Sequence, residues 1–111
     1  MKIFKEVIYD ETIGETVVID DRIFSHCVEH QLKLIREHAK ELILLSAPEH
    51  KQRNAALGLL SQQETDDVKT AIQNIRTISN QKEGEILAVV WDGTEATRSS
   101  ACDAVQAVRW D

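Results

Sequence analysis

Residues 48–91 decide the fold, and they read PEHKQRNAALGLLSQQETDDVKTAIQNIRTISNQKEGEILAVVW. Ser61 is followed three residues later by Glu64, the spacing of a capping box. In that motif the serine hydroxyl accepts a hydrogen bond from an otherwise unpaired backbone N–H at the start of a helix, and the glutamate reaches back. The pattern predicts a long helix that begins at about Gln62.

This helix carries a seam of seven positions that alternate spacings of four and three, as in a coiled coil. They are Val68, Ile72, Ile75, Ser79, Lys82, Ile86 and Val89. The seam is polar at its centre, and a polar seam residue often fixes register and oligomer number. The alternative is a solvated face where the helix leaves the core. We expect a homo-oligomer whose interface includes Ile72, Ile75, Ser79, Lys82 and Ile86.

Three further helices are expected around the long one. Helical spacing of apolar residues predicts one from Phe24 to about Ser46, with Asp20, Asp21 or Ser25 as its cap. Pro48 ends that helix and opens a short one over residues 49–60. Gly84 indicates a bend or a close helix contact. A turn at Asp92-Gly93 precedes a last helix, capped by Thr94 and ending at Trp110.

The N-terminal region predicts a β-hairpin. Residues 3–9 and 16–19 are rich in β-branched and aromatic side chains, and they flank the polar segment DETIGE. A two-stranded hairpin is marginal alone, so it must pack on helices or pair with another chain. We therefore assign residues 1–23 as a docking element, with Val7, Tyr9, Val17 and Ile19 as its contact residues. The predicted fold is mainly α: one domain, 1–111, with this hairpin followed by a helical bundle over residues 24–111.

Composition limits the function. The chain has 111 residues and a formal net charge of −6, a balance that disfavours nucleic acid and anionic membranes as partners. Cys27 and Cys102 are expected to be reduced and mostly buried. The first ten residues, MKIFKEVIYD, do not read as a signal peptide, and no apolar run is long enough to span a membrane. Trp91 and Trp110 are each expected to fill an end of the bundle, and their rings lie about 20 Å apart if the last two helices are antiparallel.

One motif suggests a metalloenzyme. Residues 26–30 read HCVEH, the inverted zinc-protease pattern in which His26 and His30 bind zinc and Glu29 activates water. Such enzymes need a third ligand and a larger scaffold. We therefore favour a solvated helix face, and we predict no catalytic residues, no metal and no cofactor.

A second motif suggests DNA binding. Residues 55–65, AALGLLSQQET, resemble the middle of a helix-turn-helix. However, Glu64, Asp66 and Asp67 fall in the first turns of the recognition helix, where they repel phosphates. We therefore expect no nucleic-acid partner.

The string EHKQRNAALGLLSQQET, followed by IRTISN and AVVWDGTEATRSSACDAVQAV, resembles a helical module at the C-terminal end of small bacteriophage tail proteins. The match covers residues 48–110 and depends mainly on Lys51, Gln52, Arg53 and Asn54, and on Arg76, Ser79 and Asn80. The resemblance implies a tail-fibre or baseplate adaptor, made in the host cytoplasm, present in the virion and bound to other tail proteins. Its alternative is a tail-fibre assembly chaperone that leaves before the particle is complete.

Overall fold

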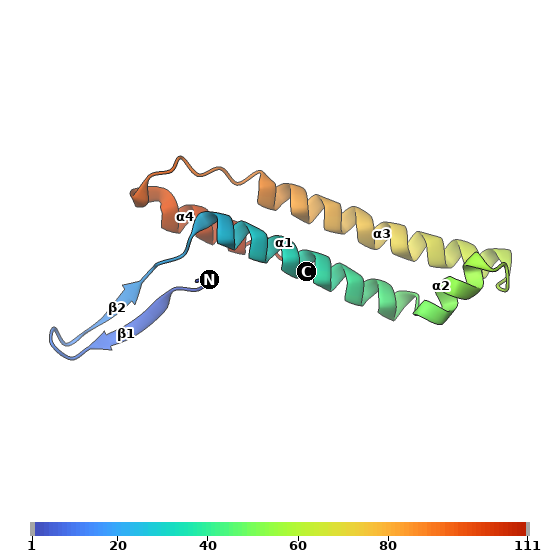
Figure 1. Cartoon of the computed structure of the whole chain (residues 1–111), viewed down its shortest axis with the longest axis horizontal. Coiled ribbons are helices and arrows are strands. Elements are labelled where there is room, and N and C mark those ends of the chain that lie inside the picture. Colours follow the sequence, from blue (N-terminus) through green and yellow to red (C-terminus); the bar gives the residue numbers. More distant parts are fainter. Residues whose placement is uncertain (1, 111) are drawn as a thin grey trace.

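The structure is a computed structural model that describes residues 2–110. Two strands, β1 (Glu6–Asp10) and β2 (Glu15–Ile19), precede four helices: α1 (Phe24–Ser46), α2 (Glu49–Ala56), α3 (Gln62–Leu87) and α4 (Glu95–Gln106). This confirms the predicted fold, a mainly helical chain with an N-terminal hairpin and one long helix (Figure 1). Within residues 2–110, no helix has the length and apolar character that crossing a membrane requires.

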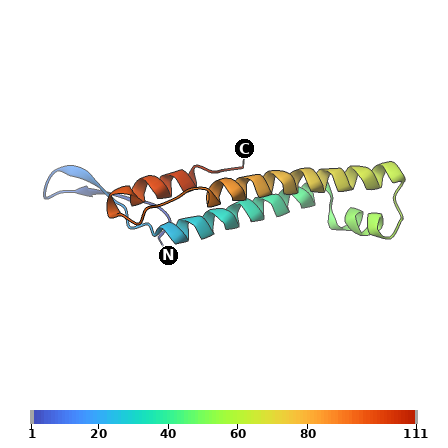
Figure 2. The same ribbon diagram turned by 90° about the horizontal axis from the view of Figure 1, so that it is seen from above.

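The molecule is a rod. It measures 69 × 30 × 20 Å and its radius of gyration is 20.3 Å, whereas a compact domain of this length would have about 13 Å. α1 and α3 lie side by side for most of the length (Figures 1 and 2). α4 packs on the first half of α1, α2 packs on α3 at the opposite end, and the hairpin projects beyond the α4 end.

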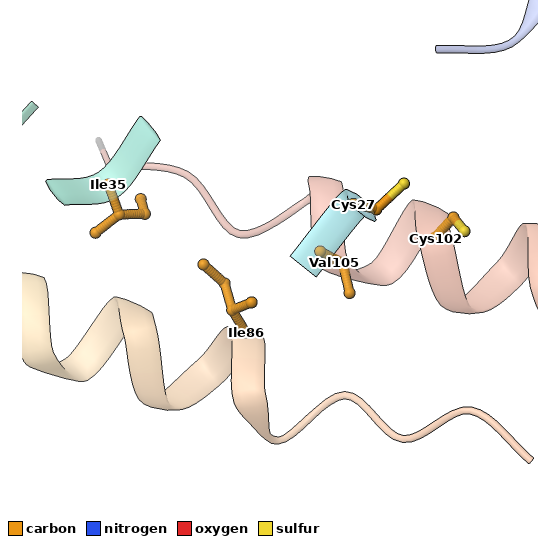
Figure 3. Packing of buried hydrophobic residues seen from close by; sticks show 5 residues of the cluster. All are labelled: Cys27, Ile35, Ile86, Cys102 and Val105. Atoms are coloured by element: carbon orange, nitrogen blue, oxygen red, sulfur yellow. The ribbon is translucent and has the colours of Figure 1, made fainter. Parts of the chain in front are cut away.

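The tightest core lies where α1, α3 and α4 meet. It consists of Cys27, Ile35, Ile86, Cys102 and Val105, all at most 2% exposed (Figure 3). Both cysteines are buried as predicted, and they form no disulfide. Burial, and secondarily the neighbouring Cys102 thiol, raises the pKa of Cys27 to about 11, so this residue is a thiol at neutral pH.

The seam of α3 is satisfied largely within the chain. Ile75, Ser79 and Ile86 are buried at 9%, 7% and 0% exposure on the side of α3 that packs on α1, while Ile72 and Lys82 are half-buried. A single chain therefore directs three of the five predicted interface residues at its own α1, so they are not available at its surface. The heptad spacing identified the contacting face, but α1 of the same chain can occupy that face as well as another subunit can.

Most of the predicted helix boundaries match, but the ends of α2 and α4 and the cap of α1 differ. The backbone N–H of Glu64 donates to Ser61 Oγ over 3.1 Å, which confirms the capping box. α2 ends at Ala56, four residues early, because Gly58 takes a positive φ of 72°. The N–H groups of Gly58 and Leu59 then bond to the carbonyls of Ala55 and Asn54, which is a Schellman motif.

α1 begins without a side-chain cap, since its N-cap is Ile23 and not one of the three predicted residues. α4 begins after Thr94 as predicted, but the Thr94 hydroxyl caps no backbone N–H and bonds instead to the side chains of Asp92 and Thr97. The helix ends at Gln106, so Trp110 lies beyond it. Its indole ring packs 5.5 Å from the ring of His38, midway along α1, rather than plugging a bundle end.

Trp91 does lie at one end of the bundle, with its ring 5.6 Å from that of Phe24 at the start of α1. Gly84 is exposed, and a Cβ there would meet no atom within 4 Å, so the close helix contact predicted as one explanation for this glycine is absent.

Candidate functional site

The hairpin is held together by hydrogen bonds within its own loop and between its two strands. Its four-residue loop, 11–14, ends at Gly14, whose φ of 69° suits glycine. The N–H of Gly14 donates to the Asp10 carbonyl over 2.8 Å, and the N–H of Thr12 donates to the Asp10 carboxylate over 2.9 Å. β1 and β2 pair antiparallel, with Ile8 opposite Val17 at the centre. The strands therefore pair within one chain, and β1 and β2 are the whole of the sheet in the described residues.

Register divides the hairpin residues between two faces, because residues directly opposite each other share a face. Val7 lies opposite Val18, and Tyr9 opposite Thr16, which makes one face entirely uncharged. We call this the neutral face. The other, acidic face carries Ile8, Val17 and Ile19 together with Glu6, Asp10 and Glu15. The four predicted contact residues therefore do not share a surface: Val7 and Tyr9 lie on the neutral face, and Val17 and Ile19 lie on the acidic face.

The neutral face is open to solvent. Val7 is 67% exposed, Tyr9 61% and Val18 57%, and Ile13 in the loop is 56% exposed. Contiguous apolar side chains on a monomer surface mark contact sites more often than scattered ones do. The hairpin has neither the hydrophobic cover nor the third strand that would stabilise it alone.

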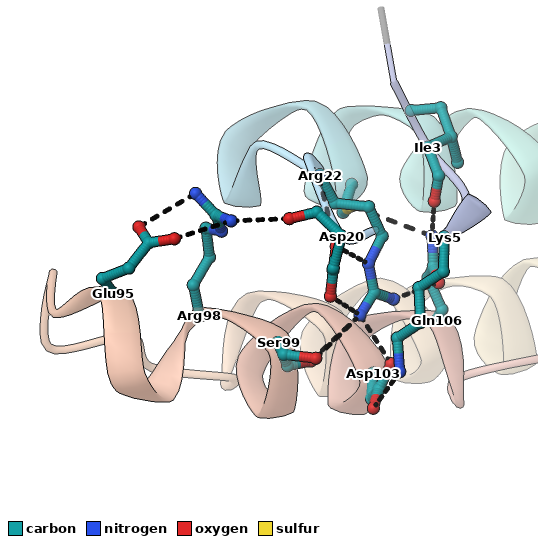
Figure 4. Close-up of polar contacts among 10 residues, drawn as sticks. Ile3, Lys5, Asp20, Arg22, Glu95, Arg98, Ser99, Asp103 and Gln106 are labelled. Carbon is teal, nitrogen blue, oxygen red and sulfur yellow. Dashed lines mark hydrogen bonds and ion pairs between the residues drawn. The ribbon is translucent and has the colours of Figure 1, made fainter. Parts of the chain in front are cut away.

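The base of the hairpin is anchored by Arg22, a side chain only 2% exposed (Figure 4). Its guanidinium donates to Asp20 over 2.8 and 2.9 Å, to Asp103 over 2.7 Å and to Gln106 Oε1 over 2.8 Å. It also donates to the carbonyl of Ser99 over 3.2 Å. A buried arginine with this many acceptors is satisfied, and it ties the end of β2 to α4.

Other residues of α4 hold the rest of the base. Arg98 donates to the Asp20 carbonyl over 2.7 Å, and Lys5 lies 3.2 Å from Asp103. The Gln106 amide donates to the Ile3 carbonyl. Both legs of the hairpin, residues 3–5 and 20–22, are therefore fixed to one helix while the strands project from it. We call this contact set the α4 anchor.

The anchor shifts the protonation of its members. The hydrogen bond from Arg22 is the largest cause that lowers the pKa of Asp20 below its ordinary value, and the same guanidinium lowers the pKa of Asp103. In turn, Asp20 raises the pKa of Arg22. All three groups are therefore charged at neutral pH, and the anchor is intact there.

Three exposed leucines lie at the opposite end of the rod (Figure 1). Leu45 in the last turn of α1 is 79% exposed, and Leu57 and Leu59 in the α2–α3 connection are 65% and 68% exposed. We call these three residues the distal leucines. The rod thus presents apolar side chains at both ends.

The candidate zinc motif lies on α1 near the hairpin end. Glu29 is exposed, as expected of a solvated face, but His26 and His30 are half-buried, so that expectation is wrong for the two histidines. The Phe4 ring lies edge-on to the His30 ring, with centroids 6.3 Å apart. Across residues 2–110, no cluster of three or more His, Cys, Asp or Glu side chains has an arrangement that could hold a metal ion.

The candidate DNA-binding segment is the junction between α2 and α3. Asp66 and Asp67 are exposed on the first turns of α3, where their carboxylates accept hydrogen bonds from Gln62 and Gln63. The helix that follows has 26 residues, and most of its buried side packs on α1.

The sequence did not reveal the contacts of Arg22 with Asp103 and Gln106, because Arg22 lies 81 and 84 positions before these residues. Only the short spacing between Asp20 and Arg22 hinted at a local ion pair.

The chain matches no protein-family model, no curated protein and no solved structure.

Proposed function

We propose that this chain is an adaptor that joins two other proteins, one at the hairpin and one at the distal leucines, and that it serves as a tail-fibre or baseplate subunit of a phage. The observation that carries the proposal is the hairpin: an anchored two-stranded sheet with a neutral face exposed to solvent. Hairpin edges are suited to pairing with a strand of another protein.

The shape supports a connecting role. Exposed apolar residues lie at both ends of a rod 69 Å long. A chain that only masked one partner would need one such surface. The resemblance of residues 48–110 to phage tail modules supplies the class of partner.

The first test is the composition of purified particles. Mass spectrometry should detect the chain in mature phage at a fixed ratio to tail proteins. Its absence from the particle, together with its presence on tail-fibre protein in extracts of infected cells, contradicts the adaptor role and favours the assembly chaperone.

The second test separates the two ends. We expect Val7→Thr/Tyr9→Thr/Val18→Thr to break one contact, because these changes remove apolar area while threonine keeps strand propensity. Leu57→Gln/Leu59→Gln should break the other contact. Crosslinking mass spectrometry should show a different neighbour lost in each variant.

The matched control is Val90→Thr, which alters a side chain that is 86% exposed in the α3–α4 connection, outside both surfaces. It should keep both neighbours. If the hairpin and distal variants both keep every neighbour, the adaptor proposal is wrong.

A further inference from the structure

The hairpin concentrates the charge of the protein. The two strands and their loop, residues 6–19, contain four acidic residues and no lysine or arginine, so this segment carries a charge of −4 out of the net charge of −6. The acids are Glu6, Asp10, Glu11 and Glu15. Asp20 is not counted, because Arg22 of the α4 anchor neutralises it. A field of one sign concentrated at one end of a rod attracts a partner of opposite sign and repels a second copy.

The charge is also ordered along β1. Glu6 and Asp10 lie at the two ends of this strand, both on the acidic face, with Ile8 between them. Val7 and Tyr9 alternate with them on the neutral face. A strand added at the outer edge of β1 would place one residue opposite each acid and apolar residues between.

This order opposes pairing with a second copy. If two β1 strands met antiparallel about Ile8, Glu6 of each chain would lie opposite Asp10 of the other. Like charges directly opposite each other destabilise a strand pair, while opposite charges stabilise it.

Among the described contacts, Lys2 is the one basic residue that pairs with Glu6 or Asp10, and it leaves both acids available to a partner. Lys2 pairs with Glu6 over 3.1 Å, but both side chains are half exposed and the pair is of the weak surface kind. Asp10 accepts a hydrogen bond only from the backbone of its own loop among the described contacts.

We propose that the outer edge of β1 binds a strand of a different protein that carries lysine or arginine at two positions four residues apart, with apolar residues between them. The basic residues pair with Glu6 and Asp10, and the apolar ones lie beside Val7 and Tyr9. This inference rests on the proposed adaptor function, because it names the chemistry of the partner at the hairpin.

The test uses the full chain and a synthetic peptide, acetyl-Gly-Thr-Lys-Val-Thr-Val-Lys-Thr-Gly-amide. The matched control peptide has glutamate in place of both lysines. In ¹H–¹⁵N NMR titrations at low salt, the basic peptide should shift the amides of residues 6–10 and bind about tenfold or more tightly than the acidic one. Raising the salt concentration should narrow that difference.

The variant Glu6→Gln/Asp10→Asn should lose the preference for the basic peptide, and it keeps an oxygen acceptor for the loop. Asp66→Asn/Asp67→Asn removes the same charge from the α2 end of the rod and should leave the preference unchanged. In sedimentation experiments, the hairpin variant should self-associate more readily than this control.

Equal binding of the two peptides overturns the inference, as does a response confined to β2 or the helices, or no response in residues 6–10. These results are distinct from failure of the adaptor role. If incorporation into particles needs the neutral face but the two peptides bind equally, the proposed preference for a basic strand fails and the adaptor proposal stands. If the protein prefers the basic peptide but is absent from particles, the preference for a basic strand stands and the adaptor proposal fails.

Discussion

The two halves of the helical rod are packed differently. Where α4 joins α1 and α3, four core side chains are completely buried: Cys27, Ile86, Cys102 and Val105. Where α1 and α3 meet without α4, Ala39, Val68, Ile75 and Ser79 retain 5 to 9% exposure and Ile72 is half-buried. Two helices leave their flanks open, and a third helix closes them. The tight half also carries the α4 anchor, so the hairpin projects from the part of the rod with the densest core.

The largest expected effect tests this difference in packing on one helix. Ile86→Ala should lower the free energy of unfolding by about 3–4 kcal/mol, because it leaves a cavity in the closed core. The matched change Ile72→Ala, on the half-covered part of α3, should cost about 1 kcal/mol. Urea denaturation measures both. Equal losses would show that the two halves do not differ.

The next effect concerns the anchor. Arg22→Ala should destabilise the chain by about 2–3 kcal/mol, which is below the usual cost of breaking a buried pair because Asp103 is half exposed. Amide exchange over residues 3–22 should rise more than in the distal half. The control Lys33→Ala removes an exposed cation from α1 and should change stability by less than about 0.5 kcal/mol.

Acid should weaken the α4 anchor. The folded pKa of Asp20 and of Asp103 lies below the ordinary value of 3.8, so these carboxylates stabilise the fold above that value. The stabilisation is lost as the pH falls below 3.8 through the depressed pKa values. Thermal unfolding followed at pH 5 and pH 3 should show a lower midpoint at pH 3. The drop should be smaller in Arg22→Ala, and a drop of equal size in that variant would assign acid sensitivity to other groups.

The smallest expected effect is a gain in the free energy of unfolding. Gly84→Ala should stabilise α3 by about 0.5–1 kcal/mol, because alanine has the higher helix propensity and its Cβ meets no neighbour within 4 Å. Thermal denaturation should show a higher midpoint. A loss of stability would mean that the backbone at Gly84 requires glycine after all.

Local signals predicted the elements well. The capping box at Ser61 gave the start of α3, and strand-forming residues around Gly14 gave the hairpin. The end of α2 does have a local signal, because Gly58 follows the helix with a positive φ. The other wrong ends depend on side-chain contacts that helical spacing does not encode. Asp20 does not cap α1 because its carboxylate accepts hydrogen bonds from Arg22, and Trp110 leaves α4 to pack on His38.

The site was predictable in part. Strand propensity located the hairpin, but the separation of neutral and acidic faces required the register, which the loop geometry sets. The anchor was not predictable, since Arg22 and Asp103 approach each other only after α4 has docked on α1. The heptad spacing of α3 predicted which face of the helix is buried, but it did not indicate whether α1 of the same chain or another subunit covers that face.

The link between Ile3 and Gln106 also orders events in time. The hairpin is synthesised before α4, whose side chains hold its base. Until α4 has been made and has docked on α1, the strands of a nascent chain are therefore not fixed at their base. Recognition that depends on a fixed hairpin would favour chains in which α4 has folded over chains in which it has not.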